Sequence, residues 1–215
     1  MGFTNKHKVR LSKAGFTVAE LMIATSVFSV VLLVGAAAFV QLGRSYYRGV
    51  TITQTQETAR QIMQSISSNV RLSSTVSSVN SATAGRQYYC VGGHRYSFKL
   101  FNKVDSSDHD NSTKFGLLAD EPNGSGCGNP FDAPITALVK PSELLGSNMR
   151  LLAFSITPIS ANSTAYSVNI TLAFGSDSVL SDPNSANAEC QGTGNATQFC
   201  AITHLSTVVY QGVNI

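Results

Sequence analysis

The longest apolar segment of the chain covers residues 21–43 and contains no charged residue. As an α-helix it would measure about 34 Å, enough to cross a hydrocarbon core of about 30 Å. Four basic residues precede this segment, and only two, Arg44 and Arg48, follow it closely. Because basic residues favour the cytoplasmic side of a membrane, we expect the N-terminus in the cytoplasm and the rest of the chain outside. The preceding basic residues are Lys6, Lys8, Arg10 and Lys13.

A second helical pattern follows, because apolar residues recur at helical spacing up to position 70 and polar residues fill the opposite face. We therefore expect the helix to continue as an amphipathic segment over residues 44–72, with its apolar stripe covered by a sheet. A coiled-coil seam is the weaker interpretation, since the pattern covers barely two heptads. Gly49 and the β-branched residues after it favour a weak or kinked segment. The stripe consists of Ala59, Ile62, Met63, Ile66 and Val70.

After Leu72 the pattern changes to strands that are rich in β-branched and aromatic residues. The alternation is cleanest over residues 165–174, and Gly92-Gly93 predicts a tight hairpin. The sequence thus predicts an α+β fold in which an antiparallel sheet within a head of residues 73–215 covers the helical stripe. The five expected strands are 87–91, 95–101, 151–157, 165–174 and 202–211, and the expected loops are 103–114, 119–134 and 175–200.

The four cysteines, Cys90, Cys127, Cys190 and Cys200, contain no C-x-x-C pair and no zinc-finger spacing with histidine. An even number behind an export signal favours two disulfides, for which three pairings are possible. We favour the local pairing, Cys90 with Cys127 and Cys190 with Cys200. Four buried free thiols remain the alternative, because free cysteine is often buried.

Glu20 does not fit its surroundings, because it is a carboxylate one helical turn into the apolar stretch, four residues after Phe16. A single carboxylate near the centre of a bilayer costs about 2.5–3.5 kcal/mol, so such a residue is interpreted as functional. Cleavage after Gly15 would make Phe16 a new N-terminus with a positive amine. That amine is a suitable partner for Glu20, on the same chain or on a neighbouring subunit, and such a pair would set the axial register between packed helices.

A short basic leader followed by Gly-Phe-Thr-x-x-Glu-Leu at the start of an apolar helix resembles the processing site of type IV prepilins and type II secretion pseudopilins. The resemblance implies a leader of residues 1–15, a membrane and filament-core helix over residues 16–43, cleavage after Gly15 by a prepilin peptidase, N-methylation of Phe16 and an assembly role for Glu20. Many major pilins have a proline late in the apolar stretch. This chain has none there, and Gly35 among small residues is the position that could loosen the helix instead.

The resemblance also implies partners and a place in the cell. The expected partners are other pilin or pseudopilin subunits, the prepilin peptidase and the inner-membrane assembly platform. The chain would cross the inner membrane once, with an extracytoplasmic head, before joining a surface or periplasmic filament. Residues 60–71 resemble the same stretch of W-type minor pilins and J-type minor pseudopilins, which, with the large head, favours a minor subunit. A type IV pilus, a secretion system and a DNA-uptake system remain equally open.

An ordinary secretory signal is the main alternative, because the basic start, the apolar segment and Ala36-Ala37-Ala38 would permit cleavage before Phe39. Glu20 and the length of the apolar segment argue against it. If that signal operated, the head would be a secreted binding module that does not polymerise. An uncleaved single-pass anchor would likewise leave a membrane-held binding module.

Charge and motif content argue against other classes of protein. Four of the 15 basic residues lie within the first fifteen positions, so the remaining 11 face 12 acidic residues, and the net charge of +3 gives no basic face for nucleic acid. Residues 105–111 are acidic but lack the glycine and glutamate of an EF-hand. Residues 124–128 match neither a P-loop nor a nucleophile elbow. His7, His94, His109 and His204 share no ligand spacing, so we expect no metal, no cofactor and no enzymatic activity.

Overall fold

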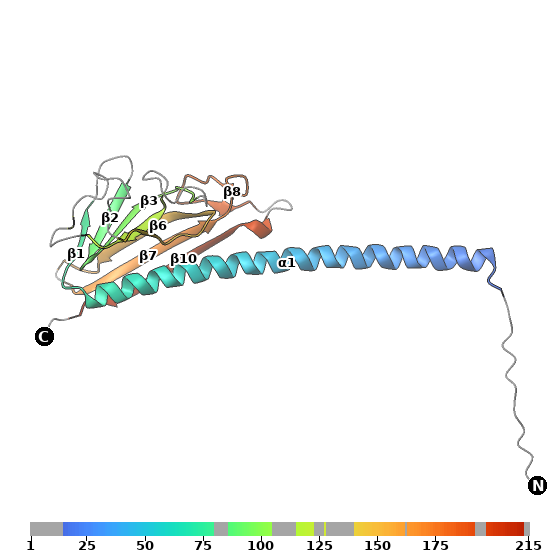
Figure 1. Ribbon diagram of the computed structural model, residues 1–215, viewed down its shortest axis with the longest axis horizontal. Helices are drawn as coiled ribbons and strands as arrows, with labels where there is room; N and C mark the ends of the chain where they lie inside the picture. Colours follow the sequence, from blue (N-terminus) through green and yellow to red (C-terminus); the bar gives the residue numbers. More distant parts are fainter. Residues whose placement is uncertain are drawn as a thin grey trace, which may run out of the picture. The chain divides into compact units, whose positions relative to one another are not determined.

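The computed structural model describes residues 15–79, 86–104, 115–122, 127, 140–161, 163–191 and 197–212 (Figure 1). Two compact units make up the chain, Met1–Gly43 and Arg44–Ile215. The predicted leader, apart from Gly15, lies outside the described residues, and so do the acidic segment 105–111 and the glycines of the segment 124–128. The fold is α+β, as the sequence predicts.

One long helix, α1, runs from Val18 to Leu72. It is unbroken through Gly49 and the β-branched residues that follow, where the sequence favours a weak or kinked segment. Tertiary contacts support the helix there, since Thr51 and Thr55 are buried against the head and each hydroxyl donates to the carbonyl four residues earlier. Packing of this kind routinely overrides weak helix propensity.

The strands of the head form three antiparallel sheets. The first has the order β1-β2-β3-β4-β5, the second the order β10-β7-β6, and the third pairs β8 with β9. The first sheet contains β1 (Val76–Val79), β2 (Arg86–Val91), β3 (His94–Lys99), β4 (Leu117–Asp120) and β5 (Ser142–Glu143). The other two contain β6 (Met149–Pro158), β7 (Ala165–Phe174), β8 (Leu180–Ser181), β9 (Glu189–Cys190) and β10 (Ala201–Tyr210), and a 3₁₀ turn, η3, covers Thr197–Phe199.

The two predicted hairpins are present. β2 and β3 pair across Gly92-Gly93, where Gly92 has a φ of 59°, a conformation that glycine adopts without strain. β6 and β7 pair across the expected connection. All five predicted strands occur within two residues of their expected bounds, but the prediction of continuous loops over residues 119–134 and 175–200 is wrong, because β4 reaches Asp120 and β8, β9 and η3 lie in the second segment.

The predicted apolar stripe of α1 is the centre of the main core. Its residues are buried together with the inner faces of the first and second sheets, which lie along this part of the helix (Figure 1). Ile66 and Val70 are fully buried, and β7 contributes Val168, Ile170 and Leu172 at the period of two that its sequence predicts. Each large apolar side chain buried in this way stabilises the head by about 1.5–3 kcal/mol.

The first sheet carries a buried ion pair on its third and fourth strands. Arg95 and Asp120 are direct cross-strand neighbours, and their side chains are 7% and 0% exposed. Arg95 donates from Nε to Oδ1 of Asp120 at 2.9 Å, and its Nη2 donates to Oδ2, so the contact is bidentate. A charge buried this deeply is tolerated only with its partner, because removal of one member leaves the other desolvated and uncompensated.

Asp120→Ala should therefore lower the free energy of unfolding of the head by about 3–5 kcal/mol. The measurement is urea unfolding of the full chain in detergent, with the unfolding of the β-rich head monitored by circular dichroism. Glu121→Ala is the matched control, because Glu121 forms an exposed ion pair with Lys140 and its loss should leave the midpoint nearly unchanged. Equal destabilisation by both substitutions would contradict the assigned role of the buried pair.

Candidate functional site

The helix start is built from Thr17 and Glu20. The backbone N–H and the hydroxyl of Thr17 both donate to Oε2 of Glu20 at 2.9 Å, and the N–H of Glu20 donates to the Thr17 hydroxyl at 3.2 Å. Thr17 is therefore the N-cap of α1 and Glu20 its third helical residue, a reciprocal capping box. The two residues satisfy donors that would otherwise lack partners at the helix end.

This capping box places the Glu20 carboxylate at the N-terminal end of the helix. Its first residue, Thr17, directly follows Gly15 and Phe16 in the chain. Sequence analysis missed the role of Thr17, although Thr-x-x-Glu before an apolar run is the sequence signature of such a box. The motif residues are accessible, and Phe16 is 88% exposed. This segment is therefore accessible from outside the chain.

The apolar half of α1 lies fully in the open. Among the described residues, α1 is the one helix long and apolar enough to cross a membrane, and none of its most apolar window is buried within the chain. Its large side chains, such as Leu33 and Phe39, are 71% and 77% exposed. Each such side chain left in water forgoes about 1.5–3 kcal/mol of burial, so this segment requires a membrane or a packing partner. It indicates membrane or secretory targeting.

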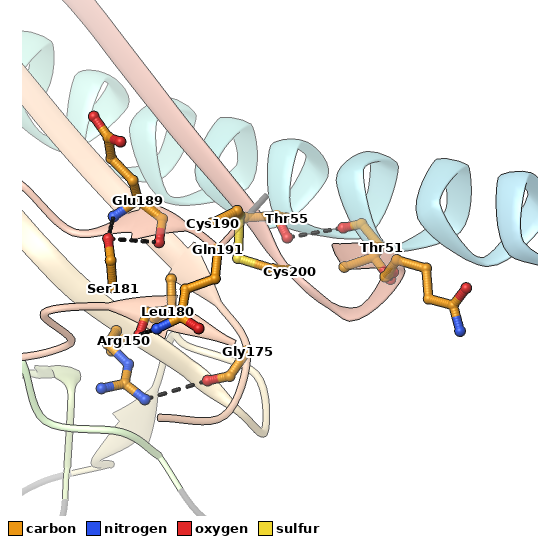
Figure 2. The surroundings of a disulfide bond; sticks show 11 residues. Thr51, Thr55, Arg150, Gly175, Leu180, Ser181, Glu189, Cys190, Gln191 and Cys200 are labelled. Atoms are coloured by element: carbon orange, nitrogen blue, oxygen red, sulfur yellow. Dashed lines mark hydrogen bonds between the residues drawn. A yellow bond between two sulfur atoms is a disulfide. The ribbon is translucent and has the colours of Figure 1, made fainter. Parts of the chain in front are cut away.

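The four cysteines form the two disulfides of the favoured pairing, Cys90–Cys127 and Cys190–Cys200. Their Cα atoms are 6.2 and 5.7 Å apart, within the usual range for the bond. Disulfides of this kind persist in oxidising compartments and so favour an extracytoplasmic head. The second one joins β9 to the residue before β10, beside Thr51 and Thr55 of α1 (Figure 2).

The Cys190–Cys200 disulfide lies at the end of the head where α1 enters it. Thr51 donates to the carbonyl of Gln198 at 3.1 Å, which fastens η3 to the helix. A cleft of about 600 Å³ opens beside this contact. Its wall is apolar apart from two charged residues, and it is lined by Arg48, Ile52, Ala188, Glu189, Cys190, Cys200, Ala201 and Ile202.

A buried arginine organises the loop next to this disulfide. Arg150 on β6 is 1% exposed and donates to the carbonyls of Gly175 and Pro183, each at 3.2 Å, and to the carboxylate of Asp177 (Figure 2 shows the Gly175 contact). The Arg150 hydrogen bond holds the pKa of Asp177 below its usual value. The arrangement is structural: it ties the β7–β8 loop to the sheet, and a second apolar cluster around Leu152, Leu180 and Cys200 packs beside it.

The remaining candidates from the sequence are not brought together. His204 lies on β10 and is hydrogen-bonded to Thr171 of β7, whereas His94 begins β3 on the other sheet. Within the described residues, no group of three or more His, Cys, Asp or Glu side chains could hold a metal ion. The acidic segment 105–111, His7 and His109 are outside those residues, so they stay untested.

Comparison of the chain with models of protein families, with curated proteins and with solved structures finds no match. Its function therefore has to be argued from the N-terminal motif, the exposed apolar helix and the head.

The Arg150–Asp177 contact predicts a specific pH dependence. Because the pKa of Asp177 is lowered in the folded state, the unfolded chain binds the proton first as the pH falls. The stabilisation is therefore present above the ordinary aspartate pKa of about 4 and is lost as the pH falls through the lowered pKa of the folded state. Asp177→Asn should have a lower urea midpoint than the wild type at pH 7, and this difference should shrink towards pH 2.

The control for this experiment is Ser178→Ala, which alters an exposed neighbour without a carboxylate. Its difference from the wild type should not change with pH. A gap between Asp177→Asn and the wild type that is equally large at both pH values would show that the substitution acts through something other than the charged contact.

Proposed function

We propose that the chain is a minor pilin or pseudopilin subunit, processed after Gly15 and assembled through its apolar helix into a type IV pilus-like or type II secretion-like filament. The observation that carries the proposal is the combination, on one helix, of the Gly-Phe-Thr-x-x-Glu start, a fully exposed apolar half and an amphipathic half buried by a β-rich head. An ordinary globular protein has no use for the exposed half, since it costs stability in water.

The chemistry of the proposed function is assembly rather than catalysis. The helix of one subunit would leave the membrane and pack its apolar surface against the helices of its neighbours. Glu20 would meet the methylated amine of Phe16, so that a charge that is costly in an apolar bundle is paired and the register is set. The prepilin peptidase and the assembly platform in the membrane are the further partners of this proposal.

A minor, tip- or initiation-type role is the finer part of the proposal. It is supported by the size of the head and by the W- and J-type likeness of residues 60–71. In the structure these residues include Ile62, Met63, Ile66 and Val70, which are buried by both large sheets. They therefore also have a purely packing role in this chain.

Glu20→Gln should reduce the amount of this chain recovered in sheared filaments, relative to the membrane fraction, by at least about tenfold, since 1.4 kcal/mol of lost subunit contact already gives that factor. Glu20 also caps the helix, so a control has to separate the two roles. Thr17→Ala removes the capping hydroxyl but keeps the carboxylate, and should cost only about 1 kcal/mol of helix stability. If both variants fail equally, capping rather than charge pairing explains the effect.

The mass of the N-terminal peptide, recovered from cell envelopes, tests the processing step directly. A peptide that begins at N-methylated Phe16 is the expected result. A peptide that begins at Phe39 would assign an ordinary signal, and an intact N-terminus would assign an uncleaved anchor. Either of these would refute filament assembly by this route and would favour the alternative, a secreted or membrane-anchored binding module.

A further inference from the structure

Five exposed side chains gather at the end of the head where α1 enters it, and we call them the collar. Four lie on one helical stretch, Arg44, Tyr46, Tyr47 and Arg48, and the fifth is Phe199 of η3. Tyr46, Tyr47 and Phe199 are 70%, 56% and 48% exposed. The ring of Tyr47 lies 6.0 Å from that of Tyr46 and 6.2 Å from that of Phe199, measured between centroids.

The residues before and after Phe199, Gln198 and Cys200, hold it in position. The carbonyl of Gln198 accepts the Thr51 hydroxyl at 3.1 Å, and Cys200 is buried and bonded to Cys190 of β9. Residues from the helix and from the far end of the sequence therefore present one aromatic cluster together. The head thus holds a half-exposed apolar ring at its surface, packed on Tyr47.

The collar begins at the first residue after the apolar segment. At 1.5 Å per residue, positions 46–48 lie about 4–8 Å beyond Gly43 along the helix. The headgroup layer on each side of a bilayer core is of similar thickness, about 5–8 Å. Tyrosine is enriched in this layer, and arginine binds phosphate oxygens through its planar guanidinium.

We infer that the collar docks the head onto the lipid headgroup layer of the membrane that the apolar helix crosses. Arg44 and Arg48 bind lipid phosphates, while Tyr46, Tyr47 and Phe199 enter the boundary between headgroups and acyl chains. The inference rests on the proposed function only in requiring that residues 16–43 span a membrane. It adds a membrane contact made by the head itself, through Phe199.

A bilayer fits this surface better than a second collar does. The collar contains two cations and no carboxylate, and Glu189, which lines the cleft beside Arg48, offsets only one of the two charges. Two copies facing each other through the same surface would therefore still meet with like net charge. An anionic headgroup layer has the complementary charge and is continuous with the membrane span that ends at Gly43. Isolated exposed aromatic residues need no explanation, but a row of three in which Tyr47 neighbours both Tyr46 and Phe199, beside two arginines at this depth, does.

The absence of tryptophan from the chain gives a direct test, because one introduced tryptophan reports its own depth. Phe199→Trp keeps an aromatic ring in the collar. Ile159→Trp is the matched control, since Ile159 is 55% exposed and follows β6 at the opposite end of the head, where the adjoining β10 end contacts Arg71. The full-length chains are reconstituted in phosphatidylcholine vesicles containing phosphatidylglycerol, and quenching by brominated lipids is measured.

For the Phe199→Trp chain we expect a blue-shifted emission and quenching of more than half by lipids brominated near the headgroup. The Ile159→Trp chain should be hardly quenched under the same conditions. Adding Arg44→Gln and Arg48→Gln to the Phe199→Trp chain should reduce its quenching, because the collar then lacks the cations that bind lipid phosphates.

Alkaline carbonate extraction of the same vesicles reports the membrane span separately. An integrated Phe199→Trp chain that is quenched no more than the Ile159→Trp chain overturns the collar contact alone, and a chain that is extracted overturns both proposals. Shielding of the collar tryptophan only in assembled filaments would assign the collar to subunit packing and also refute the membrane contact.

Discussion

The structure depends on one constraint: a single helix has to satisfy two different surroundings. Residues 21–43 carry no charge on any side of the helix and are not buried within the chain, whereas the part within the head buries one stripe and leaves its other face to solvent. The hydrophobic effect makes the first half insoluble by itself and the second half dependent on the sheets. A membrane or a bundle of like helices therefore has to complete the fold of this chain.

The head is arranged to hold the amphipathic half at both of its ends. At the last turn, Gly212 donates to the Arg71 carbonyl at 2.9 Å, and a Cβ at Gly212 would collide with that oxygen, so only glycine permits this approach. Nearby, Asn69 donates to the Tyr96 hydroxyl at 2.6 Å. At the other end, Thr51 and the Cys190–Cys200 disulfide hold η3 on the helix. The helix cannot slide relative to the head without breaking contacts at both ends.

The features of this fold that rest on a repeating sequence pattern were predictable. The apolar segment, the stripe from Ala59 to Val70 and the alternation in β7 each involve many residues in one pattern, and the structure confirms them. β8 and β9 have only two residues each and stand in a segment rich in Asp, Ser and Asn, so no periodicity indicated them. β4 was missed because Leu117 and Leu118 are both buried and do not alternate. The collar could not be predicted, since Phe199 reaches Tyr47 only through the fold.

At the candidate site Glu20 has a local role as part of the helix cap, in addition to the assembly role that we propose for it. The capping box could have been predicted from the sequence Thr-x-x-Glu. The unusual position of a carboxylate in an apolar segment instead led to the prediction of an assembly role alone. Both partners of the box, Thr17 and Glu20, lie after Gly15, so the proposed cleavage would leave it intact. A cap contributes about 0.5–2 kcal/mol, less than the 2.5–3.5 kcal/mol that an unpaired carboxylate costs deep in a bilayer. Capping therefore explains why Glu20 can sit at a helix start exposed to water, but does not by itself offset the penalty in an apolar bundle. An additional positive partner is needed there, and the amine that cleavage would create at Phe16 lies one residue before the cap.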